Sequence, residues 1–336
     1  MSELLDLVIV GAGPSGLACA IEARNRGLNF RVVEKGCIVN SIYRFPENMT
    51  FFTTAELLEV GNVPFTVRTE KPVRLDALKY YRRVVQHFDL PIRDFERVLS
   101  VKGGDGDFLI ETEDRLNERR RRRAQKVIVA VGYYDNPNRM NVPGEDLPKV
   151  SHYYTDPHPF YRKKVAVVGG KNSAAIAALE LFRNSADVTL IHRGAEMGRE
   201  VKYWILPDIN NRIQNGEIPA LFQSKVVEIR PGEIVVETPE GSKVLENDFV
   251  FALTGYHPDV AFLRSMGVEV DSATCIPRFE PETLESNVAG IYLAGSIISG
   301  RLTNKIFIEN GRFHGERILP HLQASLREPE RSRIQA

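Results

Sequence analysis

The sequence predicts an α/β fold made of two parallel-sheet domains, the second inserted within the first. An apolar strand, a glycine-rich turn and an alanine-rich helix follow one another over residues 4–23, the order that a βαβ unit requires. The same order returns at residues 164–180, and such a repeat indicates a second domain of the same kind. The length of 336 residues is enough for about two domains.

The first glycine turn has the spacing of a nucleotide-binding loop. Gly11 allows a sharp turn out of the strand, Gly13 lets backbone N–H groups approach a pyrophosphate, and Gly16 lets the helix pack on the sheet. The helix start at Pro14 and Ser15 would present about half a positive charge to the phosphates. The pattern predicts a dinucleotide site, and the alternative is a glycine turn that binds no nucleotide.

A second strand ends in Glu34, about 20 residues after the turn. A carboxylate there can accept hydrogen bonds from both hydroxyls of an adenosine ribose, whereas it would repel a 2′-phosphate. This site therefore suits FAD or NAD and not NADP. The polar and aromatic stretch 35–54 is then either an ordered loop that faces a flat ring such as isoalloxazine, or an ordinary packed loop.

The second glycine turn is followed by a strand with a different end. Strand 187–191 leads into His192 and Arg193, where the first copy has Glu34. Arg193 can pair with a 2′-phosphate, and one such bond of about 2 kcal/mol would favour NADPH over NADH about 30-fold. Lys202 could add a second positive charge. The alternative for Arg193 is an ordinary surface arginine.

Composition and charge exclude several classes of protein. The 44 basic residues balance 44 acidic ones, so no overall charge favours nucleic acid or an anionic membrane. No apolar run approaches the roughly 20 residues that span a bilayer, and no signal-peptide pattern precedes the first strand. We therefore expect a cytoplasmic protein with neither a nucleic-acid nor a membrane partner.

Two further features are judged by what they lack. The three cysteines, Cys19, Cys37 and Cys275, form no C-x-x-C pair and no metal-ligand cluster, so we expect neither a dithiol nor a metal centre. Five consecutive arginines at 119–123 would suit nucleic acid, but no aromatic residues alternate with them. We expect a solvated hairpin edge that is protected from strand addition.

The remaining patterns set the expected domain boundaries. We expect a helix over 75–88, a hairpin of strands 96–101 and 108–112, and a proline-rich linker at 136–159. A strand at 288–296 and a helix at 307–319 would complete the first domain. The prediction is two Rossmann-like, three-layer ββα domains. Their boundaries are an FAD-binding part at 1–133, an NADPH-binding domain at 134–254 and a second FAD-binding part at 255–336.

The two nucleotide folds resemble the two-dinucleotide-binding flavoproteins, and the chain length is similar to that of low-molecular-weight thioredoxin reductases. Shared blocks in both domains are similar to the YpdA family of bacillithiol disulfide reductases. The resemblance covers nearly the whole chain apart from the arginine run and the C-terminal tail. The blocks are 40–43, 50–52, 132–135, 142–150, 169–173, 204–207, 254–259 and 306–315.

The resemblance implies FAD at the first site, NADPH at the second, a homodimer or homotetramer, and reduction of a low-molecular-weight disulfide. By position, FAD would be held by Gly11, Gly13, Pro14, Ser15, Gly16, Glu34, Asn40 and Ser41. Further contacts to FAD are expected from Lys35, Phe51, Val98, Gly132 and Gly295. NADPH would be held by Gly169, Gly170, Asn172, Ser173, His192, Arg193 and Lys202.

One position departs from the family pattern. The family's proposed redox cysteine directly follows the proline of the glycine turn, and this sequence has Ser15 there. A hydroxyl can donate to a pyrophosphate, but it cannot form the mixed disulfide of thiol exchange. Cys19, one helical turn further on, is the other candidate redox residue, although free cysteines are mostly buried as small hydrophobes.

These observations favour an NADPH-dependent flavoenzyme, in which nicotinamide reduces the flavin and the flavin then reduces an acceptor. The acceptor would be a bacillithiol-type disulfide or, alternatively, a quinone, a flavodoxin, a ferredoxin or oxygen. A flavin monooxygenase is less favoured, because Gly144 and His152 lack the spacing expected of that class. A non-catalytic redox sensor that binds both nucleotides is a third hypothesis.

Overall fold

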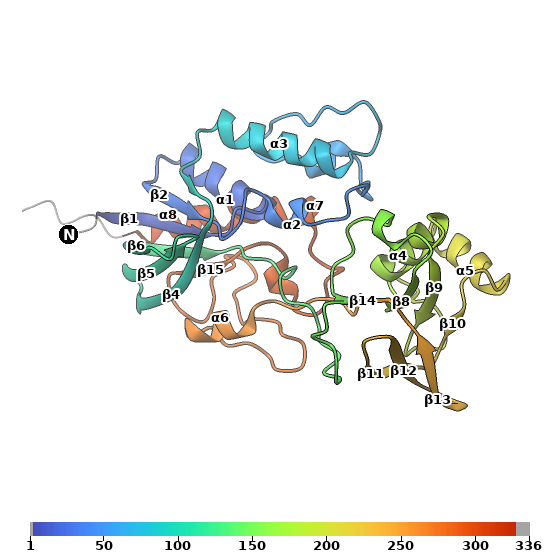
Figure 1. Cartoon of the computed structure of the whole chain (residues 1–336). Helices are drawn as coiled ribbons and strands as arrows, with labels where there is room; N and C mark the ends of the chain where they lie inside the picture. The colour runs from blue at the N-terminus through green and yellow to red at the C-terminus, as the bar shows by residue number, and fades with distance from the viewer. Residues whose placement is uncertain (1–2, 327–336) are drawn as a thin grey trace, which may run out of the picture. The chain divides into compact units, whose positions relative to one another are not determined.

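The structure is a computed structural model that describes residues 3–326. Contacts divide these residues into two compact units, and unit 2 is inserted in the chain of unit 1 (Figure 1). Unit 1 contains residues 3–44, 49–136 and 256–326, and unit 2 contains 45–48 and 137–255. The end of the tail, from residue 327, lies outside the described residues.

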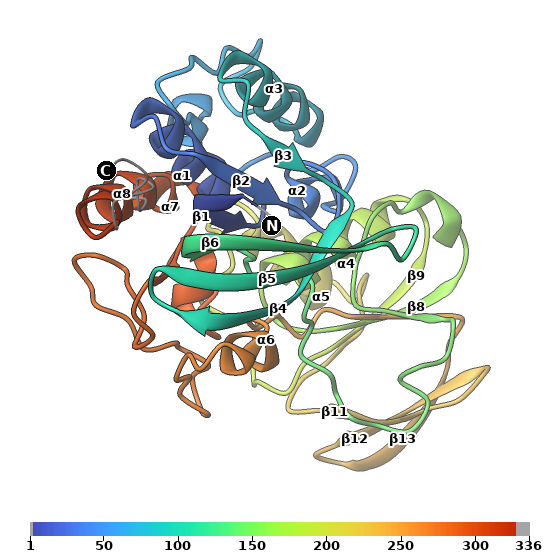
Figure 2. The same cartoon turned by 90° about the vertical axis from the view of Figure 1, so that its left-hand side faces the viewer.

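Unit 1 is built on a seven-stranded sheet in the order β3-β2-β1-β6-β5-β4, with β15 also paired to β6. Strands β3, β2, β1, β6 and β15 are parallel, whereas β4, β5 and β6 form an antiparallel meander that lies in front in Figure 2. The bounds are β1 Leu4–Val10, β2 Phe30–Val33, β3 Ile92–Arg93, β4 Glu96–Gly104, β5 Asp107–Asp114, β6 Arg119–Val129 and β15 Ile291–Leu293.

The helices of unit 1 include a closely packed pair, α1 and α8. A Cβ added at Gly315 on α8 would lie 3.0 Å from the carbonyl oxygen of Ala18 on α1, so glycine permits this approach. The helices are α1 Pro14–Asn25, α2 Asn40–Tyr43, α3 Arg74–His87, α6 Val260–Ser265, α7 Ile308–Gly311 and α8 His314–Ala324, with 3-10 turns η1 Ala55–Leu58 and η3 Gly295–Ser299.

The structure differs from the sequence expectation at the last helix. The segment expected as one helix over 307–319 forms two, α7 and α8. Gly311 ends the first, and glycine is a weak helix former. No helix within residues 3–326 is long and apolar enough to cross a membrane.

The arginine run forms the first half of β6, paired with β5. Arg119 and Arg121 form ion pairs of 3.1 and 2.9 Å with Glu113 and Glu111, which lie directly opposite. The run is therefore not a purely solvated edge, because acids of the meander neutralise its charges.

Unit 2 has a parallel sheet in the order β10-β9-β8-β14-β7 and a separate antiparallel sheet of β11, β12 and β13. The strands are β7 Val150–Ser151, β8 Lys164–Val168, β9 Asp187–Ile191, β10 Ala220–Leu221, β11 Lys225–Ile229, β12 Glu233–Thr238, β13 Gly241–Glu246 and β14 Phe249–Ala252. The helices are α4 Asn172–Arg183 and α5 Leu206–Gln214, with a 3-10 turn η2 His158–Phe160.

Strand β8 separates two cores of unit 2. Val165 and Val167 pack with the alanines of α4, whereas Ala166 packs with Val226 and Ile234 of the second sheet. This gives the helix, sheet and sheet layers that the sequence predicts and confirms the α/β class. The passage 136–159 is not a plain linker. Its apolar residues pack into the core that contains Ala166, and β7 within it pairs with β14.

Candidate functional site

The first glycine turn joins β1 to α1 and has one open position. Gly11 has a φ of 106°, and a Cβ there would lie 2.5 Å from the carbonyl oxygen of Ala130. A Cβ at Gly16 would collide with the carbonyl oxygen of Gly11, whereas a Cβ at Gly13 would meet nothing within 4 Å. The turn therefore packs tightly on the protein side and leaves free space at Gly13, where a pyrophosphate would need it.

Glu34, at the end of β2, lies against this turn. Its Oε2 accepts a 2.8 Å hydrogen bond from the backbone N–H of Ala12, and its Oε1 accepts one of 2.8 Å from Gly36. The residue is 7% exposed, and this burial raises the pKa of its carboxyl while the two N–H groups oppose the rise. Each oxygen of this carboxylate keeps a lone pair, so Glu34 can still accept hydrogen bonds from the ribose hydroxyls that the sequence analysis expects here.

Ser15 lies half-buried in the first turn of α1, among three segments of unit 1. A Cβ added at Gly295 would be 2.8 Å from its Oγ, and one added at Gly311 would be 2.7 Å away. Glycine at both positions makes room for the hydroxyl. The structure therefore brings together Ser15 and Gly295, which the sequence analysis both expects to contact FAD.

Sequence reasoning missed His314, which contacts the backbone of Gly295. Its Nδ1 accepts a 2.9 Å hydrogen bond from the backbone N–H of Gly295, so Nδ1 carries no proton. The imidazole is 3% exposed, and burial lowers its pKa to about 4. The signal available in the sequence was only its place inside the shared block 306–315.

Sequence reasoning also missed Asp135. Its carboxylate pairs with Lys35 at 2.9 Å and with Arg44 at 2.8 Å, and so joins the residue after Glu34 to the end of α2. The signal available in the sequence was again only its place inside a shared block, 132–135. Close by in sequence, Gly132 is near η3, since a Cβ there would lie 3.6 Å from the Oγ of Ser296.

The segment of Asn40 and Ser41 forms α2, and it is tied to the turn. The N–H of Val39, which has a φ of 49°, donates a 3.0 Å hydrogen bond to the carbonyl of Ala12. The side chain of Asn40 covers Gly36, where a Cβ would lie 2.5 Å from its Cγ. Asn40 therefore belongs to the same corner as Glu34.

For two expected cofactor contacts, Phe51 and Val98, no hydrogen bond within residues 3–326 connects them to the turn. Phe51 is 6% exposed, and its N–H donates to the carbonyl of Pro72 at 2.9 Å. Val98 is half-buried on β4, two residues after Glu96, whose N–H donates to the carbonyl of Glu34 at 2.9 Å. Both stay predictions as cofactor contacts.

The cysteines are poorly placed for thiol chemistry. Cys19 is fully buried, and burial raises the pKa of its thiol to about 12, so it stays protonated at neutral pH. Cys275 is also buried, and burial raises the pKa of Cys37 as well. The structure argues against the redox role considered for Cys19. Within residues 3–326 no group of His, Cys, Asp and Glu is arranged to hold a metal ion.

Unit 2 repeats the tight turn at the end of β8. Gly169 has a φ of 153°, and a Cβ there would lie 2.6 Å from the carbonyl oxygen of Leu253. A Cβ at Gly170 would collide with the imidazole of His192, which covers the turn. Burial and the nearby charge of Arg193 lower the pKa of His192, so the ring is neutral at pH 7.

Asn172 connects this turn to the segment before α5. Its Oδ1 accepts a 2.9 Å hydrogen bond from the N–H of Lys202, and its Nδ2 donates to the carbonyl of Glu200 at 3.0 Å. Sequence reasoning missed the pair of Lys171 with Glu200, at 3.1 Å. Ser173 follows Asn172 in the first turn of α4.

Arg193 is exposed and forms no ion pair with any residue in 3–326. The guanidinium is therefore available to a ligand beside the turn. Unit 1 thus presents a buried acid next to its glycine turn, whereas unit 2 presents a free cation next to its own.

The chain is similar to known proteins in both sequence and structure. Residues 8–295 match a family described as pyridine nucleotide-disulphide oxidoreductase. The chain is 47% identical over 313 residues to bacilliredoxin reductase Bdr of Bacillus subtilis, covering 93% of this chain and 95% of that protein.

Two solved structures of bacillithiol disulfide reductase Bdr (YpdA) are similar to this chain. The protein from Bacillus cereus is 44% identical with a TM-score of 0.94, and the match covers 96% of this chain and 99% of the other. The protein from Staphylococcus aureus is 40% identical with a TM-score of 0.92, and the match covers 97% and 100%.

Proposed function

This chain belongs to the YpdA family of pyridine nucleotide-disulphide oxidoreductases, and from that membership we propose an NADPH-dependent, FAD-containing reductase of a low-molecular-weight disulfide. The observation that carries the choice of cofactors is the contrast between the buried Glu34 at one glycine turn and the unpaired Arg193 at the other. When bound, the two cofactors would supply the hydride and electron transfer that the protein's own side chains cannot.

The first site supports FAD. Glu34 is fixed by two backbone donors and can accept from ribose hydroxyls, while its charge disfavours a 2′-phosphate. The space at Gly13 admits a pyrophosphate to the start of α1. Pro14, Ser15 and Asn40 border the same corner and would orient the cofactor.

The second site supports NADPH. Arg193 offers a guanidinium fork that suits a 2′-phosphate, and the neutral ring of His192 beside it adds no competing charge. Asn172 holds the segment of Lys202 against the turn, so a second cation stands near the same ligand. Because NADPH differs from NADH only in its 2′-phosphate, cations at this position would favour NADPH.

The disulfide would be reduced without a thiol in the glycine turn. Ser15 occupies the position of the family's proposed redox cysteine, and a hydroxyl forms no mixed disulfide. Cys19 and Cys275 are both buried, so neither replaces it. We also propose a homodimer or homotetramer by the family resemblance, which light scattering of the purified protein would test.

The test is NADPH consumption by the FAD-loaded protein under anaerobic conditions with bacillithiol disulfide as the only acceptor. We expect stoichiometric NADPH oxidation that stops when the disulfide is left out. Flavin that bleaches with NADPH and is not reoxidised by the disulfide would contradict the proposal.

A second arm of the test uses bacilliredoxin, because the Bacillus subtilis relative is named for that substrate. Turnover with bacilliredoxin alone would move the assignment from a small disulfide to a protein disulfide. Turnover with neither would direct the search to quinones, flavodoxins and ferredoxins.

A further inference from the structure

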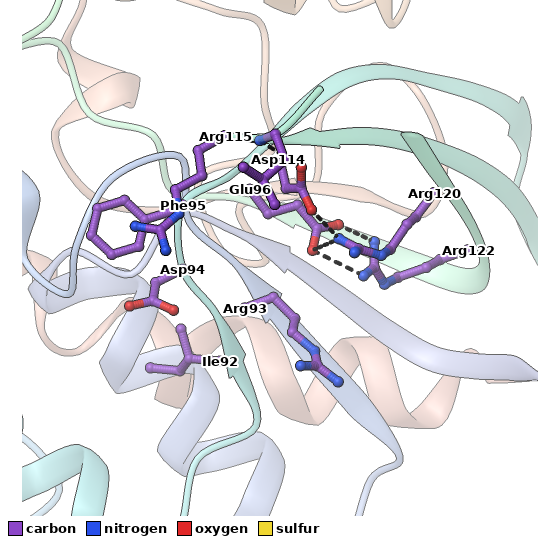
Figure 3. A pocket seen from close by; sticks show the side chains of 10 residues that line it. Ile92, Arg93, Asp94, Phe95, Glu96, Asp114, Arg115, Arg120 and Arg122 are labelled. Atoms are coloured by element: carbon purple, nitrogen blue, oxygen red, sulfur yellow. Dashed lines mark hydrogen bonds and ion pairs between the residues drawn. The ribbon is translucent and has the colours of Figure 1, made fainter. Parts of the chain in front are cut away.

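Unit 1 contains a cavity of about 460 Å³ at the start of β4, where the arginine run faces the edge strand β3. Four arginines line it, namely Arg93, Arg115, Arg120 and Arg122. Figure 3 shows that they come from three parts of the fold: Arg93 from β3, Arg115 from the β5–β6 turn, and the other two from β6. The cavity has the size of a small-molecule site.

Two of the three acids in the cavity wall are already neutralised by β6. Glu96 is 3% exposed and pairs with Arg122, whose Nη2 lies 3.1 Å from its Oε2. Asp114 pairs with Arg120 at 2.9 Å and accepts from the backbone N–H of Leu116 at 2.9 Å. The charges of Arg120 and Arg122 are therefore balanced within the wall, as the dashed lines of Figure 3 show.

The other two arginines are not balanced. Within residues 3–326, the side chains of Arg93 and Arg115 make no hydrogen bond and no ion pair. Arg115 lies over the ring of Phe95, 5.6 Å from its centroid. The third acid, Asp94, lies near Cys37. Burial raises the pKa of the Cys37 thiol most, and the charges of Glu34 and Asp94 raise it further.

A fifth arginine adds to this excess of positive charge. Arg31, on β2, is next to the edge strand, and its pKa is lowered by burial first and then by the charges of Arg93 and Arg122. Like charges held this close repel one another, and an anion among them would relieve that repulsion.

The apolar wall of the cavity is held in place. Phe95 is 44% exposed, yet its φ of 53° lies in the left-handed region, which is unfavourable for a bulky side chain. Its backbone N–H donates a 2.9 Å hydrogen bond to the carbonyl of Gly36, which fixes this conformation. An aromatic face kept exposed at a cost in backbone strain is typical of a binding surface.

We propose that this cavity binds a small molecule through a phosphate or carboxylate group, which Arg93 and Arg115 hold with their guanidinium groups. The planar fork of a guanidinium matches the paired oxygens of either anion. Phe95 and Leu116 take the apolar part of the same ligand. None of the residues that line this cavity belongs to either glycine turn, and the proposed function assigns no role to Arg93 or Arg115.

The test is isothermal titration of the FAD-loaded protein with inorganic pyrophosphate and, separately, with citrate, at constant ionic strength. We expect binding that the double variant Arg93→Gln and Arg115→Gln weakens by about 100-fold, because the variant loses two charge-assisted bonds and each contributes about tenfold. Preference for pyrophosphate would identify a phosphate ligand, and preference for citrate a carboxylate ligand.

The matched control is Arg119→Gln with Arg121→Gln, which removes the same charge from the opposite face of β6 and should leave the affinity unchanged. Flavin absorbance and a thermal melt establish that both double variants fold and keep FAD. Equal affinity of wild type and the Arg93/Arg115 variant, or equal loss in both double variants, would overturn the proposal. So would an affinity that falls only in Arg193→Gln, since the anion would then occupy the other unit.

Discussion

The backbone N–H of Ala12 donates a 2.8 Å hydrogen bond to the Oε2 of Glu34, so the glycine turn is joined directly to the end of β2. The buried carboxylate of Glu34 thus connects two segments that are 22 residues apart in the sequence. Any change to that acid acts on the turn itself as well as on the ribose it would hold.

We therefore expect Glu34→Ala to lower FAD affinity about 100-fold, because the N–H groups of Ala12 and Gly36 both lose a charged acceptor. Flavin content after purification and a fluorescence titration with FAD measure this. The control is Glu22→Ala, which removes an acid on α1 that pairs with Arg26 at 3.7 Å. Equal FAD content in the two variants would show that Glu34 is not a cofactor residue.

The glycines of the first turn separate folding from binding. Gly13→Ala should fold, because its Cβ meets nothing within 4 Å and its φ of −72° suits alanine. It should still lose most of its FAD, because the methyl group fills the space of the pyrophosphate. Gly16→Ala should instead lower the melting temperature, since its Cβ collides with the carbonyl of Gly11. Thermal melts and flavin absorbance of both variants test this, and normal FAD binding by Gly13→Ala would refute it.

These glycines could be predicted from the sequence because their constraints are local: strand, turn and helix are adjacent in the chain. The arginine run shows where this reasoning ends. Five charges are visible in the sequence, but Glu113 and Glu111 become partners of two of them only through the register of β5 against β6. A pairing register of this kind is a property of the folded sheet.

At the second turn, Arg193→Gln should raise the KM for NADPH about 30-fold and leave the KM for NADH unchanged. The reason is that one charge-assisted bond to the 2′-phosphate contributes about 2 kcal/mol. Steady-state rates with both nucleotides measure the ratio. Lys243→Gln, on β13, removes a cation that pairs with Glu240 at 2.7 Å and serves as the control. Equal changes for NADPH and NADH would mean that Arg193 does not read the phosphate.

Ser15→Cys should speed the reduction of bacillithiol disulfide about tenfold, a change of about 1.4 kcal/mol in the barrier. A thiol at this position can form the mixed disulfide that a hydroxyl cannot, and the glycines at 295 and 311 leave room for the larger sulfur. Anaerobic NADPH oxidation measures the rate. Ser265→Cys, on the exposed side of α6, controls for the mere presence of another thiol. An unchanged rate in Ser15→Cys would indicate that disulfide reduction in this protein does not use the turn.

His314 and Asp135 could not be predicted, for a physical reason. Gly295 and His314 lie on either side of α7, and Ser15 joins them from the other end of the chain. The burial that lowers the pKa of His314 comes from tertiary packing, and no periodic pattern or motif spacing in the sequence predicts it. Residues that complete a site through tertiary contacts become visible only in the folded structure.

The last prediction concerns the pH dependence of stability. The pKa of His314 falls from 6.5 in its usual state to about 4 in the fold, because burial disfavours the charged ring and Arg317 repels it. Between these values the unfolded chain binds a proton that the folded chain does not, so stability is lost as the pH falls from about 6.5 towards 4. The full loss would be about 3 kcal/mol.

His314→Asn should remove most of this dependence, because an amide oxygen can still accept from the N–H of Gly295 and does not titrate. Urea unfolding at pH 4.5 and pH 7.5 compares the two free energies of unfolding in each protein. His158→Asn, at an exposed position of η2, is the matched control. If wild type and His314→Asn lose the same stability on acidification, the proton is taken up elsewhere. A smaller loss in His314→Asn alone assigns it to the ring that holds Gly295 beside Ser15.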